Sequence, residues 1–380
     1  MKRIGNLYEI VCSKDTIHKA IHEASKGKKK RRDVQKILAN EDFYVDRIHR
    51  MLVSESFIPT PYIRETICDG SQNKVRNILK PRFYPDQIVH WCIYLAFREP
   101  FYRGMYVFSC GSIPNRGVHY GKKYVQKWVR DDRKDTKYYL KMDIKKFYPS
   151  VKPWRLMQKL ERKIKDQQFL RLMRKILFMS DGLPIGILLS QILANFFMNE
   201  VDFYIKQELG AKYYIRYADD MVIFDRNKKR LHQMRRQIEQ RLAQEGLTLK
   251  ENWCVSRFDK EPLDFMGFRF YRDHVTLRRA IMLRISRKVR KVARKGKRVT
   301  PTDAFSIISR WGWIKHTDSY GFFVKWIKPY ISIVRMKNIA RRAQSEEVQK
   351  RKYGYAAGVG QDQLRKCCVP QHGNYGRSRH

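Results

Sequence analysis

The sequence lacks any hydrophobic run of the roughly 18 residues that a membrane-spanning helix needs. Its first residues, Met1-Lys2-Arg3, lead into no apolar signal-peptide core, so no feature of the sequence predicts export. Cysteine is scarce as well: the seven cysteines include no Cys-x-x-Cys pair, which argues against a disulfide framework and against a zinc site. We therefore expect a cytoplasmic protein with no membrane partner.

Acidic residues are few relative to basic ones. The chain has 37 Asp and Glu against 81 Lys and Arg, a formal net charge of +44 that far exceeds what solubility requires. Such an excess along the whole chain implies a long polyanionic partner. Because 43% of the 380 residues are hydrophobic and 13% are aromatic, the chain has enough apolar material for a large core or several subdomains.

Two of the scarce acidic residues stand together in the tetrapeptide Tyr217-Ala218-Asp219-Asp220. Apolar residues at 213–215 and 221–224 flank this short polar pair, and the pattern predicts a strand, a tight turn and a second strand. Both carboxylates would then lie at the tip of a hairpin. An isolated Asp-Asp pair in such a place is usually an ordinary solvated turn, so a functional interpretation needs a further observation.

A third carboxylate, Asp143, ends another apolar strand, which the pattern predicts over 138–143. Three acidic groups at the ends of neighbouring strands can hold two Mg²⁺ ions, with Mn²⁺ as a substitute, because such cations prefer carboxylate oxygens. One ion would activate a primer 3′-hydroxyl, and the other would bind the triphosphate of an incoming nucleotide. The sequence thus predicts that Asp143, Asp219 and Asp220 are metal ligands and catalytic residues.

This arrangement resembles that of reverse transcriptases, in which a strand aspartate, followed five residues later by an aromatic residue, precedes a Tyr-x-Asp-Asp hairpin. Asp143, Tyr148 and the residues from Tyr217 to Asp220 match that pattern. The resemblance implies an α+β fold of the right-hand polymerase type, with an antiparallel palm sheet, fingers and a short helical thumb. It also implies an RNA-directed DNA polymerase of bacterial or phage origin that binds dNTPs, a template RNA and the RNA/cDNA duplex.

The resemblance gives roles to the residues after Asp143. The main-chain carbonyl of Ile144 would complete a metal shell, and the amides of Lys146 and Phe147 would hold phosphate oxygens. Tyr148 would be the steric gate, whose ring leaves no room for a 2′-hydroxyl and so selects deoxynucleotides. The alternative is that Phe147 and Tyr148 are core aromatics.

Two arginines resemble triphosphate ligands of the family. Arg76 lies in a basic extended segment similar to the fingers of bacterial reverse transcriptases, where Lys74 and Lys80 are equally suitable ligands. Arg116 lies in the next loop, which resembles the family's second motif. Both arginines are therefore predicted to bind the nucleotide.

The second half of the chain is predicted to hold amphipathic helices and a primer-binding turn. The apolar spacing indicates a helix over 228–244. A strongly basic helix over 278–298, followed by a second helix over about 301–315, resembles a thumb. In the first half of the chain, a further helical pattern runs over 154–179. Between the helix over 228–244 and the thumb, Phe265-Met266-Gly267-Phe268 resembles a primer grip, in which Met266 and Gly267 would let the backbone approach the primer end closely.

The run from Gly182 to Gln191 departs from most reverse transcriptases, which have Gln at the position of Ile185 and Pro at the position after Ser190. Ile185, Gly186 and Gln191 would contact the incoming nucleotide, and an aliphatic Ile185 would weaken base discrimination by about 1 to 3 kcal/mol. This form resembles the enzymes of diversity-generating retroelements, which copy a template RNA with frequent errors at adenine. That resemblance implies a further partner, a small basic accessory variability determinant protein.

The expected organisation is a basic helical extension over 1–60, fingers over 61–136, a palm over 137–275 with finger elements interleaved, a helical thumb over 276–350 and a flexible basic tail over 351–380. Two alternatives remain open. The first is a retron, group II intron-like or defence-associated reverse transcriptase of ordinary fidelity. The second is a basic RNA-binding protein without catalytic activity.

Overall fold

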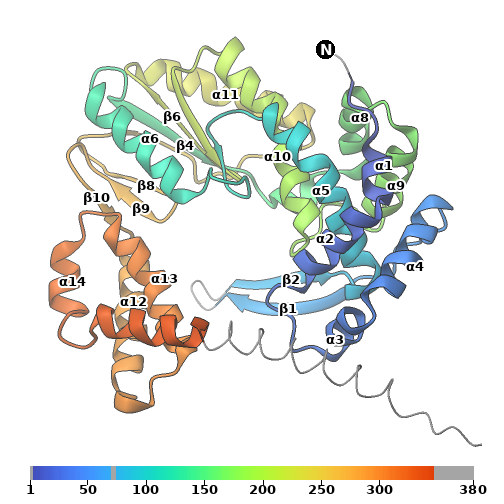
Figure 1. The fold of residues 1–380 in the computed structure, drawn as a ribbon. Helices are drawn as coiled ribbons and strands as arrows, with labels where there is room; N and C mark the ends of the chain where they lie inside the picture. The colour runs from blue at the N-terminus through green and yellow to red at the C-terminus, as the bar shows by residue number, and fades with distance from the viewer. Residues whose placement is uncertain (1–2, 70–73, 346–380) are drawn as a thin grey trace, which may run out of the picture. The chain divides into compact units, whose positions relative to one another are not determined.

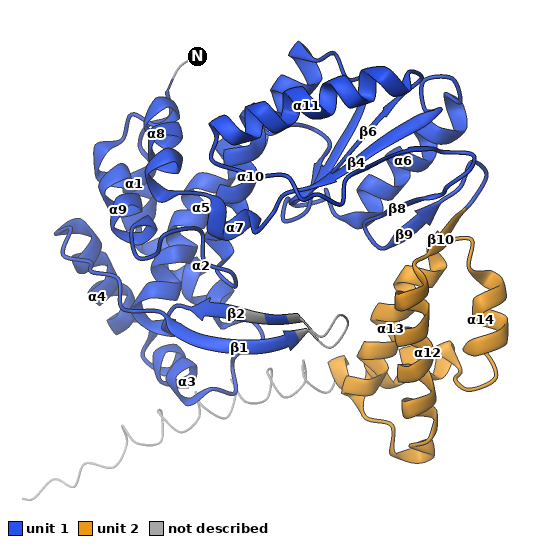
Figure 2. Ribbon diagram, turned by 180° about the vertical axis from the view of Figure 1, so that it is seen from behind, with its two compact units in different colours: residues 1–274 blue, residues 275–380 orange. Residues whose placement is uncertain are grey.

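The structure is a computed structural model that describes residues 3–69 and 74–345 (Figure 1). The chain divides into two compact units, residues 1–274 and residues 275–380 (Figure 2). The tail predicted over 351–380 and the last residues of the predicted thumb lie outside the described residues. Within the described ranges, no helix is long and apolar enough to cross a membrane.

The first unit is built around a five-stranded sheet with the strand order β3-β5-β6-β4-β7. Its strands are β3 (Ser109–Cys110), β4 (Tyr138–Asp143), β5 (Tyr213–Tyr217), β6 (Asp220–Asp225) and β7 (Cys254–Arg257). Neighbouring strands are antiparallel, except that β3 and β5 run parallel. The antiparallel palm sheet expected from the sequence is confirmed, and its register places Asp143 opposite Asp220.

Helices that follow the strands cover this sheet and supply its core. Helix α11 (Lys228–Gln244) packs on β4 and β6, and α6 (Val118–Asp131) packs on β3 and β5. In α11 the buried residues Leu231, Met234 and Ile238 recur at helical spacing, which is the stripe that the sequence predicts. The side chain of Asn227 caps this helix by accepting hydrogen bonds from the next turn, so the helix begins where β6 ends.

The other helices of this unit form a helical layer that includes the apolar helix α5. They are α1 (Leu7–Cys12), α2 (Lys14–Ser25), α3 (Arg32–Ala39), α4 (Glu41–Val53), η1 (Phe83–Gln87), α5 (Ile88–Arg103), α7 (Phe147–Ser150), α8 (Pro153–Lys163), α9 (Gln167–Leu177), α10 (Leu188–Phe203) and η2 (Tyr204–Glu208). Helix α5 contacts α1, α2 and α10 and buries eight of its residues. Figure 1 shows this helical layer beside the sheet.

Helix α5 buries His90 completely, and neither ring nitrogen of His90 has a hydrogen-bond partner among the described residues. Burial lowers the pKa of His90 to about 4, whereas a histidine in an unfolded chain titrates near 6.5. The unfolded chain therefore binds the extra proton first, and we expect the free energy of unfolding to fall by about 3 kcal/mol as the pH drops from 6.5 to 4.

Chemical denaturation at several pH values checks this expectation. His90→Leu should flatten the fall between pH 6.5 and 4, because leucine adds no proton to either state. His274→Gln, which changes a half-exposed histidine on the surface, should keep the pH dependence of the wild type. An unchanged pH dependence in His90→Leu would show that other groups cause it.

Two small antiparallel pairs complete the first unit. The hairpin of β1 (Ile63–Asp69) and β2 (Lys74–Lys80) stands apart from the five-stranded sheet (Figure 1). Strands β8 (Leu263–Phe265) and β9 (Phe268–Phe270) pair across a two-residue turn. Both turn residues, Met266 and Gly267, have positive φ angles of 53° and 87°, which favours glycine at the second of them.

The second unit contains β10 (Val275–Leu277), α12 (Arg279–Ala293), η3 (Gly296–Arg298), α13 (Pro301–Lys315) and α14 (Tyr320–Trp326), and a further helical stretch runs over 333–345. Helix α12 buries Ile285, Val289 and Val292 and packs against α13, while its many basic residues lie outside that stripe. Thr300 and Asp303 form a capping box that fixes the start of α13. Lys288 and Lys295 also bind Asp303 and, together with the cap, hold the pKa of its carboxyl well below the ordinary range.

Candidate active site

The turn between β5 and β6 places Asp219 beside the end of β4. Tyr217 pairs with Asp220, so Ala218 and Asp219 form a two-residue turn in which Ala218 has a left-handed φ of 53°. The amide of Ala218 donates to the carbonyl of Cys110 at 3.3 Å, and the carbonyl of Asp219 accepts from the amide of Ile144 at 3.2 Å. These bonds fix the turn to β3 on one side and to the residue after Asp143 on the other.

The carboxyl groups of Asp143 and Asp219 face each other. Burial and the neighbouring charge of Asp143 raise the pKa of Asp219 above its ordinary value. Oδ1 of Asp143 is buried and has no hydrogen-bond partner within the described ranges. Two half-buried carboxylates that repel each other, one with an unsatisfied oxygen, are a donor set that fits a divalent cation.

Asp220 lies opposite Asp143 in the pairing of β4 and β6. Its Oδ2 is 3.8 Å from Nζ of Lys141, which itself donates to the carbonyl of Asp264 at 2.6 Å. Across residues 3–69 and 74–345, no three Asp, Glu, His or Cys side chains converge as a metal-binding group. The structure therefore brings Asp143 and Asp219 together and leaves Asp220 adjacent to them.

Lys250 is a site residue that the sequence analysis missed. Its Nζ is 2.6 Å from Oδ2 of Asp143, and its amide donates to the carbonyl of Asp143 at 2.8 Å. The bridge between Ile144 and Leu249 brings the two segments together. The position of Lys250, directly after Leu247-Thr248-Leu249, is the only local signal for this contact.

The residues after Asp143 turn sharply into α7. Lys146 has a left-handed φ of 47° and precedes this one-turn helix, whose Phe147 is buried in the core. Tyr148 is half-buried, and burial together with the charge of Asp219 raises the pKa of its hydroxyl. The carbonyl of Tyr148 accepts from the amide of Leu183 at 2.9 Å. Tyr148 thus lies between the carboxylates and the loop that carries Ile185.

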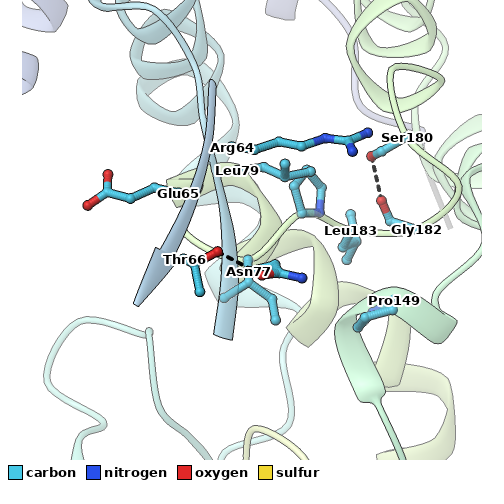
Figure 3. A pocket seen from close by; sticks show the side chains of 11 residues that line it. Arg64, Glu65, Thr66, Asn77, Leu79, Pro149, Ser180, Gly182 and Leu183 are labelled. Carbon is cyan, nitrogen blue, oxygen red and sulfur yellow. Dashed lines mark hydrogen bonds between the residues drawn. The ribbon is translucent and has the colours of Figure 1, made fainter. Parts of the chain in front are cut away.

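A pocket of about 400 Å³ separates this loop from the β1–β2 hairpin. Figure 3 shows Arg64, Thr66, Asn77 and Leu79 of the hairpin facing Ser180, Gly182 and Leu183 of the loop, with Pro149 beside them. Ile185 also lines this pocket.

The loop that carries Ile185 is attached to β2. The carbonyl of Ile185 accepts from the amide of Leu79 at 3.0 Å. Gly186 follows with a φ of +105°, and a Cβ atom there would collide with Ile78. Gln191 is exposed in the first turn of α10. Of the three residues predicted here, Ile185 lines the pocket and Gly186 supports the loop.

The two predicted arginines differ in how far the structure describes them. Arg116 is half-buried and donates to the carbonyl of Tyr106 at 3.2 Å, which ties its guanidinium to the chain before β3. Arg76 lies in β2 opposite Ile67, but its side chain is outside the described part of the structure.

The predicted primer grip is the turn between β8 and β9. There the side chain of Met266 packs against Gly121 of α6.

Comparison with known proteins agrees with this geometry. Residues 101–270 match the family model described as "Reverse transcriptase (RNA-dependent DNA polymerase)". The chain is 30% identical over 202 residues to the retron Ec73 reverse transcriptase of Escherichia coli, an alignment that covers 47% of this chain and 61% of that protein. Residues 101–270, which include Asp143, Asp219, Tyr148 and Lys250, are therefore similar to a reverse transcriptase domain.

Two further proteins are similar over other lengths. A 91 kDa protein in the cob intron of Schizosaccharomyces pombe is 29% identical over 174 residues, covering 43% of this chain and 21% of that protein. A solved structure of apo telomerase from Candida tropicalis superposes with a TM-score of 0.46 at 10% identity, covering 74% of this chain and 61% of that one. The chain thus spans less than two thirds of each of these relatives.

The position of Tyr148 predicts its effect on sugar selection. If its ring is the steric gate, Tyr148→Ala should raise the incorporation of ribonucleotides relative to deoxynucleotides about 10- to 100-fold, because the cavity would then admit a 2′-hydroxyl. Single-nucleotide extension assays with each dNTP and rNTP pair measure this ratio.

Tyr148→Phe is the control, because it keeps the ring and should keep the wild-type ratio of ribonucleotide to deoxynucleotide incorporation. Equal ratios in Tyr148→Ala and the wild type would leave Tyr148 as a core aromatic.

Proposed function

We propose that this protein is an RNA-directed DNA polymerase that extends a primer on a template RNA. The observation that carries the proposal is the half-buried pair of Asp143 and Asp219, which lies beside Tyr148 within the residues that match the reverse transcriptase family model. The net charge of +44 suits a protein that holds a template RNA and an RNA/cDNA duplex. Activity of this kind is consistent with the cytoplasmic location expected from the sequence.

Each group of the site has a distinct task in this proposal. Asp143 and Asp219 hold divalent cations, Mg²⁺ in the first place, which activate the primer hydroxyl and neutralise the triphosphate. Tyr148 excludes the 2′-hydroxyl, and Ile185 lines the space for the nascent base pair. Lys250 holds Asp143 in place and keeps a positive charge next to the site of phosphoryl transfer.

The finer proposal is that the enzyme copies RNA with frequent errors at adenine, as a diversity-generating retroelement requires. Its support is Ile185, an aliphatic side chain in the wall of the pocket where a hydrogen-bonding residue would otherwise read the base pair. The accessory variability determinant protein belongs to this proposal as a partner. A retron-type enzyme of ordinary fidelity is the second candidate, and its support is the similarity to the retron Ec73 reverse transcriptase.

Sequencing of extension products separates the two candidates. We expect the wild type to misincorporate at template adenines, and Ile185→Gln to lower that error rate about 10-fold, because a polar side chain restores a hydrogen bond to the nascent pair. The assay uses purified protein, primed RNA, Mg²⁺ and dNTPs. Ile58→Gln makes the same exchange at an exposed isoleucine outside the pocket and should leave the error rate unchanged. Accurate products from the wild type would favour the retron-type candidate.

A further inference from the structure

Arg216 is the largest fully buried side chain of the described structure. It lies in β5, two residues before the turn, and its guanidinium donates five hydrogen bonds. Nε and Nη2 bind the two carboxylate oxygens of Asp202 at 2.8 and 2.7 Å, and Nη2 also binds Oγ of Ser109 at 2.8 Å. Nη1 binds Oδ1 of Asn195 at 3.1 Å and the carbonyl of Ala218 at 2.9 Å. Every N–H donor of the guanidinium is therefore used.

The bond to Ala218 acts on the turn that carries Asp219. Ala218 has a left-handed φ of 53°, a conformation that a residue with a Cβ disfavours and that persists only where its surroundings impose it. Arg216 donates a hydrogen bond to the carbonyl of Ala218, and the amide of Ala218 donates one to the carbonyl of Cys110. The peptide that joins Ala218 to Asp219 is thus fixed in orientation, and the direction of the Asp219 carboxylate is fixed with it.

Two other partners of Arg216, Asn195 and Asp202, belong to α10, and Ser109 belongs to β3. Helix α10 begins directly after the loop that carries Ile185. Asp202 is itself held by the hydroxyl of Tyr214 at 2.6 Å, and Asn195 donates to the carbonyl of Gly111 at 2.9 Å. A buried charge pair is costly to desolvate, and an apolar replacement of both partners is often as stable. Stability alone therefore gives little reason for an arginine at this position.

We propose that Arg216 is a positioning residue that orients the peptide between Ala218 and Asp219, so that the carboxylates of Asp219 and Asp143 together bind a divalent cation. This inference rests on the proposed polymerase function and specifies how its metal site is held. Arginine suits the role because its planar fork binds Asp202 through two atoms while Nη1 still reaches the turn. Lysine, with one ammonium group, keeps the charge but cannot make both contacts.

The test compares Arg216→Lys with the wild type in the full chain. Binding of Mn²⁺ alone, followed by electron paramagnetic resonance, should be at least about 10-fold weaker in Arg216→Lys, since small misplacements of site groups have large effects. Primer extension should need more Mg²⁺ and show a kcat about 10- to 100-fold lower, with KM for dNTP within about twofold of the wild type. Circular dichroism and melting temperature report whether the variant folds.

Lys159→Met is the matched control. Lys159 is also a buried cation, bound to Glu200 at 2.5 Å and Glu245 at 3.0 Å, and both of these partners lie outside the turn. This variant should lose stability and yet bind Mn²⁺ like the wild type. Wild-type Mn²⁺ affinity in Arg216→Lys, or equal weakening in Lys159→Met, would overturn the inference and leave Arg216 with a structural role only.

A milder variant covers the case in which Arg216→Lys does not fold. Ser109→Ala removes one partner of the guanidinium and no charge, so it should fold and bind Mn²⁺ about threefold more weakly. Unchanged Mn²⁺ affinity in a folded Ser109→Ala would then count against the inference. If Mn²⁺ binding falls as expected but the wild type makes no DNA, the positioning role is supported and the polymerase proposal is the one that fails.

Discussion

Asp219→Asn is expected to lower DNA synthesis on an RNA template about a thousandfold or more. Asparagine keeps the shape of the side chain but removes the negative charge that a bound divalent cation needs, a loss of about 4 kcal/mol in transition-state stabilisation. Primer extension under single-turnover conditions measures the effect. Asp273→Asn removes a carboxylate from an exposed turn of the same unit and should retain wild-type synthesis.

The stability of Asp219→Asn should change in the opposite direction. Because burial and Asp143 raise the pKa of Asp219, the folded state holds a proton more tightly than the unfolded chain does. Stability is therefore lost as the pH rises through the raised pKa, and at neutral pH the charged Asp219 weakens the metal-free fold. Asp219→Asn removes that repulsion and should melt at the wild-type temperature or above.

RNA affinity, measured together with DNA synthesis, tests the alternative of a non-catalytic RNA-binding protein. Such a protein would bind RNA with the same affinity in the wild type and in Asp219→Asn, and neither form would synthesise DNA. Synthesis by the wild type that is lost in Asp219→Asn, at unchanged RNA affinity, supports the polymerase. A wild type that makes no DNA, even with its native template and accessory protein, would contradict it.

Gly186→Ala is expected to destabilise the first unit by roughly 2 to 5 kcal/mol, the sum of a strained backbone and a steric overlap. Gly186 has a φ of +105°, and a methyl group would meet Ile78 of β2. The neighbouring Ile185 lines the pocket and binds Leu79, so displacing β2 should deform the pocket. We expect primer extension to fall at least about 10-fold, chiefly through a higher KM for dNTP.

Gly27→Ala separates the effect of backbone strain from the effect of steric overlap. Gly27 also has a positive φ, +73°. Apart from Gly27 and its two neighbours in the chain, no described atom lies within 4 Å of the position that a Cβ would take. This variant should lose about 1 kcal/mol through backbone strain alone and keep wild-type kinetics. Denaturant unfolding and steady-state extension of both variants provide the comparison. Equal losses in the two would mean that contact between Gly186 and β2 has no special importance.

The elements whose signals are local could be predicted from the sequence. The strands on both sides of the turn, and the helices over 228–244 and 301–315, are confirmed because their apolar spacing and caps are contained in the segments themselves. Asn227 and Thr300 begin these two helices, as capping residues do. The helix predicted over 278–298 ends earlier, at Ala293.

Elements that depend on distant contacts were predicted less well. The helical pattern over 154–179 is two helices, α8 and α9, because Ile164 leaves the helix to bridge with Ile4 and Asp166 then caps α9. The contact that ends α8 therefore lies outside the local segment.

In the candidate site, too, residues with a local sequence signal were predicted and residues that depend on distant contacts were missed. The spacing of Asp143, Tyr148 and Asp219 identified groups that the fold brings together, since each follows directly from a strand end. Lys250 and Arg216 were missed, because one reaches Asp143 and the other Asp202 only through tertiary structure. The convergence of Asp220 with the other two carboxylates stays a prediction.

The attachment of the β1–β2 hairpin to the loop at Ile185 has a consequence for the synthesis of the chain on the ribosome. A two-stranded hairpin is marginal alone, and this one exposes Ile63, Ile67 and Val75. Its partner at Ile185 follows Leu79 by roughly a hundred residues, which take about 5 to 20 seconds to translate. During that interval the nascent hairpin exposes these apolar side chains without the loop that later binds β2. Chaperones that bind exposed apolar strands would therefore act on this protein before residues 101–270 have folded.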